Sequence, residues 1–267
     1  MDKKTNIVQY VLIGLLLIAS FLLGSLFTKV QYLEKNKTSA ATATGTQNAA
    51  APQQPAQVAV TMDQIKNVYT QSAIKFGDDK KKLIFLDVSD PSCPYCHIAA
   101  GKNGELNTQV GDRFKLVADG GTYVAPVPEM EKLVKEGKAA YAYVYFVGHG
   151  NGEMGTKALY CANENGKFWE AHDALMTNAG YNLLNTTVKN DKTKTPELVD
   201  FLKDVMSAQT LTACLESGKY DSQLTADIAL AKGLGVSGTP GFFVNTNRFA
   251  GAYSYKDMES AVETALK

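Results

Sequence analysis

The chain has 267 residues, and its 27 basic and 27 acidic residues give a formal net charge of zero. This balance offers no basic excess to attract a nucleic acid, so no nucleic-acid partner is expected. Four cysteines occur, all of them after residue 92. An even set of cysteines in an exported chain favours an oxidising compartment, where disulfides persist.

The N-terminus contains a segment without charge from Thr5 to Thr28. Its apolar core, residues 7–27, would span about 30 Å as a helix, which is enough to cross a bilayer. This core is longer than that of a cleaved export signal, and no A-x-A site follows closely. We therefore predict an uncleaved membrane anchor over residues 1–30, with a cleaved signal as the alternative.

Residues 31–60 are rich in Ala, Thr, Gln and Pro and contain little that could form a core. They are predicted to be a flexible tether. Because all four cysteines follow the anchor, the folded part is expected on the outer side of a bacterial cell membrane that the chain crosses once. The remaining 61–267 are long enough for one large domain or for a small fold carrying an insertion.

Short apolar runs predict strands, and helical spacing fills the chain between them. Thr61 with Gln64 and Ser254 with Asp257 form capping patterns at the first and last helices of this part. Residues from about 153 to 233 show helical periodicity. The predicted class is α/β, with a helical subdomain inserted into a small sheet. The predicted strands are Leu83–Val88, Tyr141–Val147, Phe242–Val244 and Arg248–Ala250.

The sequence Cys93-Pro94-Tyr95-Cys96 directly follows the first of these strands. A helix N-terminus favours negative charge, and the thiolate is the reactive form of cysteine, so Cys93 is the candidate nucleophile. Cys96 lies one turn further and can resolve a mixed disulfide. Pro94 suits the first helical turn, where its missing N–H costs little.

Two other chemistries fit the same residues. Cys93 to His97 matches the C-x-x-C-H pattern of c-type haem attachment. A C-x-x-C pair is also half of many zinc sites, although Cys161 and Cys214 lack the paired spacing of the other half. The buried-strand pattern before the dithiol favours redox exchange over both.

Three ordered segments together resemble DsbA-type thiol:disulfide oxidoreductases of the thioredoxin superfamily. They are the Cys93–Cys96 motif, residues 167–175 (KFWEAHDAL) and residues 235–245 (GVSGTPGFFVN). The resemblance covers roughly residues 61–267. It implies a thioredoxin-like fold with an inserted α-helical subdomain, preceded here by the predicted transmembrane helix. It also implies that the chemistry needs neither a dissociable cofactor nor a metal.

The resemblance assigns roles to matching positions. Pro240 corresponds to a cis-proline whose loop faces the dithiol, with Thr239 beside it against substrate. Asp87 corresponds to a buried acid that accepts a proton from Cys96. Asp90, three residues nearer, is expected to cap the turn.

Other residues are expected to tune or brace the site. Tyr95 would contact substrate, and Pro94 and His97 would adjust the redox properties of the dithiol. Some relatives carry a second, non-catalytic disulfide at positions like Cys161 and Cys214, and we expect one here. His172 is assigned to packing or to a backbone hydrogen bond.

One segment departs from the family pattern, because glycines interrupt the helical pattern from about 101 to 127 beside the dithiol.

A shallow peptide groove is expected beside the dithiol. It would be formed by the Tyr141–Val147 strand, the Pro240 loop and nearby apolar residues.

The predicted function is disulfide donation to reduced exported proteins through Cys93 and Cys96. A membrane-embedded partner, such as a quinone-linked thiol oxidase, would reoxidise the dithiol, and the N-terminal helix would hold the protein to the membrane. Disulfide reductase or isomerase activity is the enzymatic alternative. A tethered chaperone module without turnover is the alternative from another class.

Overall fold

A computed structural model describes residues 59–267. Within this range no helix combines the length and the apolar character that a bilayer crossing requires. The predicted anchor over residues 1–30 lies outside the described residues, as does the predicted tether up to residue 58.

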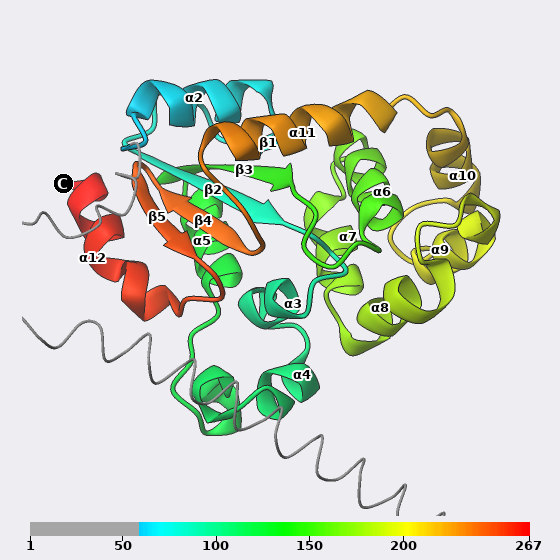
Figure 1. The fold of residues 1–267 in the computed structure, drawn as a ribbon, viewed down its shortest axis with the longest axis horizontal. Helices are drawn as coiled ribbons and strands as arrows, with labels where there is room; N and C mark the ends of the chain where they lie inside the picture. The colour runs from blue at the N-terminus through cyan, green and yellow to red at the C-terminus, as the bar shows by residue number, and fades with distance from the viewer. Residues whose placement is uncertain (1–58) are drawn as a thin grey trace, which may run out of the picture. The chain divides into compact units, whose positions relative to one another are not determined.

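A five-stranded mixed sheet, in the order β1-β3-β2-β4-β5, forms the centre of the fold (Figure 1). Only β2 and β3 run parallel to each other, and the other neighbours are antiparallel. Every residue of β2 and β3 is buried, as expected for apolar strands covered on both faces. The strands are β1 Ile74–Phe76, β2 Leu83–Ser89, β3 Ala139–Tyr145, β4 Gly241–Val244 and β5 Asn247–Ala250.

The four predicted strands are confirmed. The bounds of β2, β4 and β5 differ from the prediction by one residue, and those of β3 differ by two residues at each end. The β3 strand begins two residues earlier than predicted because Ala139 pairs with Leu83 of β2. It also ends earlier, since the backbone at Gly148 and His149 binds a side chain instead of the sheet. The three-residue edge strand β1 was not predicted, since so short a run carries little periodic signal.

The side chains of alternate residues in the central strands point into two separate hydrophobic cores. Ile84 and Leu86 face one core, which α2 and α11 cover. Leu83 and Phe85 face the larger core, together with α5, α6, α7 and α12. Figure 1 shows α2 and α11 side by side along one face of the sheet. These helices are α2 Met62–Gln71, α5 Pro126–Lys135, α6 Glu153–Glu164, α7 Phe168–Leu175, α11 Asp221–Gly233 and α12 Tyr255–Leu266.

Both predicted capping boxes are present, at Thr61 of α2 and at Ser254 of α12. The chain between β3 and β4 is helical. Most of it lies to the right of the sheet in Figure 1, whereas α11 runs back along the face of the sheet beside α2. Besides α6, α7 and α11 it contains α8 Asn178–Asn182, a π-helix Leu183–Val188, α9 Thr195–Phe201 and α10 Ala208–Glu216.

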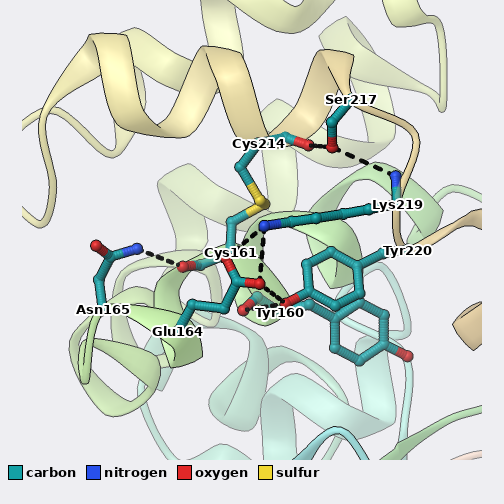
Figure 2. Close-up of polar contacts among 8 residues, drawn as sticks. All are labelled: Tyr160, Cys161, Glu164, Asn165, Cys214, Ser217, Lys219 and Tyr220. Atoms are coloured by element: carbon teal, nitrogen blue, oxygen red, sulfur yellow. Dashed lines mark hydrogen bonds and ion pairs between the residues drawn. A yellow bond between two sulfur atoms is a disulfide. The ribbon is translucent and has the colours of Figure 1, made fainter.

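A disulfide joins Cys161 of α6 to Cys214 of α10 (Figure 2). Polar contacts brace both of its ends. Asn165 donates to the Cys161 carbonyl at 2.9 Å, and Ser217 donates to the Cys214 carbonyl at 2.7 Å. Lys219 binds Glu164 of α6 at 2.6 Å, which ties the loop after α10 to the same helix. The disulfide therefore locks two helices of the inserted region together.

The glycine-rich segment from 101 to 125 folds back onto the helix that carries the dithiol. It contains α4 Gly104–Gln109 and two short 3-10 turns, and Leu116 bridges to Tyr123. Phe114 and Tyr123 form a small apolar cluster with Ile98 of α3 (Pro94–Ala100). The helix α3 ends at Gly101, whose φ of 66° lies in the left-handed region that glycine favours.

Candidate active site

The dithiol lies where β2 leads into α3. Cys93 is the N-cap of α3 and Pro94 begins the helix, so the Cys96 N–H donates to the Cys93 carbonyl at 3.0 Å. Both thiols are free, and their residues are only 4% and 2% exposed. The Cys93 thiol contacts the Thr239 carbonyl at 3.5 Å, whereas Cys96 Sγ accepts from the Asp90 N–H at 3.4 Å.

The pKa values of the two thiols are shifted in opposite directions. The Cys96 side chain hydrogen-bonds Cys93 and lowers the Cys93 pKa to about 6, although burial opposes the shift. Backbone N–H groups at the start of α3 contribute to this lowering. Burial and the neighbouring Cys93 raise the pKa of Cys96 well above its ordinary value. Cys93 is therefore the thiolate of the pair, and Cys96 stays protonated until a base takes its proton.

The Thr239-Pro240 peptide bond is cis, and its loop faces Cys93. A third segment closes the same corner. Gly148 lies so close that a Cβ there would be 3.1 Å from Cys93 Cβ and 1.8 Å from Thr239 Oγ1. Only glycine fits at this position. Three distant parts of the chain, at Cys93, Gly148 and Thr239, therefore meet around the sulfur of Cys93.

Asp90 connects the turn before Cys93 to the Gly148 segment, in addition to the predicted capping of the turn. Its Oδ1 accepts from the Ser92 N–H at 2.8 Å and from the Ser92 hydroxyl at 2.7 Å. Its Oδ2 accepts from the N–H groups of Gly148 and His149 at 2.8 and 2.9 Å. The sequence could not show the second pair of contacts, because their donors lie almost 60 residues away.

Asp87 lies on β2, the strand that leads to the dithiol, and is 1% exposed. Its Oδ2 accepts from the Tyr141 hydroxyl at 2.9 Å. Burial raises the Asp87 pKa to about 6, while His172 and the Tyr141 hydrogen bond pull it down. Such a carboxyl can exchange a proton near neutral pH, as the proposed acid–base role at Cys96 requires.

His97, which was predicted to tune the dithiol, is fully buried. Its two ring nitrogens lie 2.8 and 2.9 Å from the carbonyls of Pro91 and Met176. Burial lowers the His97 pKa to about 4 and so disfavours a charged ring at pH 7, although the same two carbonyls oppose the shift. Both nitrogens already face carbonyls, which leaves none for a haem iron. The disulfide likewise engages Cys161 and Cys214, which removes them as zinc ligands.

The groove beside the dithiol matches the prediction only in part, because the Pro240 loop lines it through Thr239 but the β3 strand does not. Tyr141 to Tyr145 are fully buried in the middle of the sheet and cannot line a surface. Instead the glycine-rich segment and the chain after β5 form a groove of about 590 Å³. Tyr95 is 41% exposed on one side of it and contacts Phe114 edge to face, with the ring centroids 5.9 Å apart. The residues that line it include Tyr95, Arg113, Phe114, Tyr123, Thr239, Tyr253 and Asp257.

Comparisons with known proteins agree with this geometry. The model of the family described as Thioredoxin matches residues 127–264, just over half of the chain, and so includes the Pro240 loop. A curated relative, the Na(+)/H(+) antiporter NhaA 3 of Salinispora tropica, is 27% identical over 119 residues. That match covers 44% of this chain but only 17% of the antiporter.

Solved structures share the fold at low sequence identity. BdbD from Bacillus subtilis has a TM-score of 0.51 at 17% identity, over 74% of this chain and 94% of BdbD. A thioredoxin-like oxidoreductase from Silicibacter pomeroyi has a TM-score of 0.50 at 18% identity, over 77% and 98%. A variant of alpha-DsbA1 from Wolbachia pipientis has 0.51 at 15%, over 78% and 96%. The chain belongs to the thioredoxin family, with the architecture of its DsbA-type thiol:disulfide oxidoreductases.

Proposed function

We propose that the protein donates disulfides to reduced, exported proteins through Cys93 and Cys96. The observation that carries this proposal is the position of Cys93 at the N-terminus of α3, facing the cis Thr239-Pro240 loop, where its pKa is lowered while that of Cys96 is raised. Stabilising the Cys93 thiolate stabilises the reduced dithiol relative to the disulfide. The disulfide form is then a good oxidant, which favours donation over reduction.

The exchange follows from the geometry. A client thiolate attacks Cys93 of the oxidised pair, and Cys96 leaves and takes up a proton. A second client thiol then attacks the client sulfur of the mixed disulfide, and Cys93 leaves as a stabilised thiolate. The groove between Tyr95 and Tyr253 is open beside Cys93 and can hold an extended client segment. No dissociable cofactor takes part in these steps.

The cellular setting is part of the same proposal. The Cys161–Cys214 disulfide supports a location outside the cytoplasm, because structural disulfides persist in oxidising compartments. The apolar segment within residues 1–30 would anchor the domain to a bacterial cell membrane. A membrane-embedded thiol oxidase would return the Cys93–Cys96 pair to its disulfide form.

Two measurements test the proposal. Oxidation of a reduced model protein should depend on Cys93 and survive the joint replacement of Cys161 and Cys214 by alanine. The equilibrium of the Cys93–Cys96 pair with glutathione should give a reduction potential above about −180 mV. A potential near about −270 mV would identify a reductase instead. Full activity of Cys93→Ser would overturn the catalytic assignment, and no turnover by the wild type would favour the chaperone alternative.

A further inference from the structure

Asp87 has a role in the proposed exchange only if its proton can leave the protein interior. The carboxyl is 1% exposed, and its single hydrogen bond within residues 59–267 comes from Tyr141. Its second oxygen, Oδ1, is buried and has no hydrogen-bond partner among the described residues. A buried acid that takes a proton in every catalytic cycle needs a route that returns it to water.

The helix α7 packs on the strand next to Asp87 and carries a second unpartnered polar atom. Trp169 and Phe168 of α7 contact Tyr141 and Tyr143 of β3, with ring centroids 5.1 and 5.7 Å apart. Asp87 pairs with Tyr143 in the parallel register of β2 and β3, and its carboxyl accepts from the Tyr141 hydroxyl. The helix α7 therefore contacts the same two tyrosines that neighbour Asp87.

His172 lies one turn along α7 from Phe168, with the two ring centroids 5.6 Å apart. The residue is 1% exposed, and its Nε2 has no partner in the described part of the chain. Its other nitrogen, Nδ1, lies 3.3 Å from Asp173 Oδ1. The ring therefore has one side in the interior and the other on a surface carboxylate.

The surface end of the series Asp87, His172 and Asp173 is accessible to solvent. The Asp173 side chain is 36% exposed and forms a salt bridge of 2.5 Å with Lys102, which is 35% exposed. Burial opposes the shift, but the hydrogen bonds from His172 and Lys102 lower the pKa of Asp173. Asp173 is thus an ionised carboxylate at neutral pH, and any proton that it receives from His172 passes on at once to the surrounding water.

We propose that His172 relays the proton of Asp87 to Asp173 and the solvent. This inference rests on the proposed function. During reoxidation the Cys96 thiol gives its proton to the Asp87 carboxylate, and the Cys96 thiolate attacks the Cys93 sulfur of the mixed disulfide. The Cys93–Cys96 bond forms, the bond from Cys93 to the partner breaks, and the partner leaves as a thiolate. Nε2 of His172 takes the proton from Asp87, directly or through water, while Nδ1 releases one towards Asp173.

Several charged or titratable groups surround His172 and bear on the pH dependence. Asp87 and His97 interact with the ring electrostatically from β2 and α3, and Asp173 does so from α7. Because a positive charge on His172 acts to lower the pKa of Asp87, a side chain that never carries this charge should move the ionisation of Asp87 to higher pH. Asp173 in turn interacts with Lys102 and Lys135.

The test separates the two thiol steps with an aromatic disulfide that releases a coloured thiolate at each step. In the reduced protein, attack by Cys93 gives the first release, and attack by Cys96 on the mixed disulfide gives the second. We expect His172→Gln to slow the second release at least roughly tenfold at pH 7 and to move its pH profile upward. The first release needs no proton from Cys96 and should change less than about twofold.

A second variant keeps the test decisive if His172→Gln does not fold. Asp173→Asn changes a half-exposed side chain and should slow only the second release. Asp200→Asn is its matched control, since Asp200 forms a comparable surface pair with Lys203 at 3.1 Å. An unchanged second release in either folded variant, or an equal slowing of both releases, overturns the relay. If the wild type itself shows no release at Cys93, the proposed function fails instead.

Discussion

Replacing Asp87 by asparagine should stabilise the protein, and more so as the pH rises. The buried carboxyl has its pKa raised from the ordinary 3.8 to about 6, with burial as the main cause. A raised pKa stabilises the fold below pH 4, where the group is neutral in both states, and this contribution is lost as pH rises through 6. The difference between 3.8 and about 6 corresponds to roughly 3 kcal/mol at pH 8. The asparagine amide carries no charge and avoids this cost.

The assay is urea unfolding at pH 4 and pH 8, with Cys93→Ser and Cys96→Ser in both proteins so that neither thiol titrates. We expect Asp87→Asn to raise the free energy of unfolding by roughly 3 kcal/mol at pH 8 and by little at pH 4. Asp204→Asn, a change at an exposed position, should do neither. A loss of stability at pH 8, or an equal gain at both pH values, would refute the reasoning. In the active enzyme the same substitution should slow the Cys96 step, so stability and activity oppose each other here.

Three further outcomes follow from the site and its surroundings. Alkylation of Cys93 by iodoacetamide should rise with pH around a midpoint near 6 and level off above it; a midpoint near 8.5 would contradict the lowered pKa. Gly148→Ala should cut turnover at least roughly tenfold, because its methyl would lie 1.8 Å from a hydroxyl of the facing loop. Gly238→Ala, where nothing lies within 4 Å, should leave turnover unchanged. Joint replacement of Cys161 and Cys214 by alanine should lower the free energy of unfolding by about 4 kcal/mol, since the disulfide closes a loop of 53 residues, with Cys93 turnover retained.

Local signals in the sequence were enough to predict the fold class, the main strands and the dithiol. Periodicity and capping depend on residues close together in the chain, so β2, β4 and the helices α2 and α12 could be predicted from neighbouring residues alone. The Cys93–Cys96 motif after a buried strand indicated redox chemistry for the same reason. Its resemblance to DsbA-type proteins added the Pro240 loop and the second disulfide.

The surroundings of the two sulfurs, in contrast, depend on packing between distant parts of the chain. Asp90 binds the backbone of Gly148, which lies more than 50 positions away in the chain. His172 likewise acts on Asp87 from a distant part of the chain, and the lowered pKa of His97 depends on its burial. The groove beside the dithiol differs from the predicted one for the same reason. The glycine-rich segment folds back onto α3 in a way that periodicity does not encode. A pKa, like a cavity, is set by what packs around a group, and that depends on the whole fold rather than on local sequence.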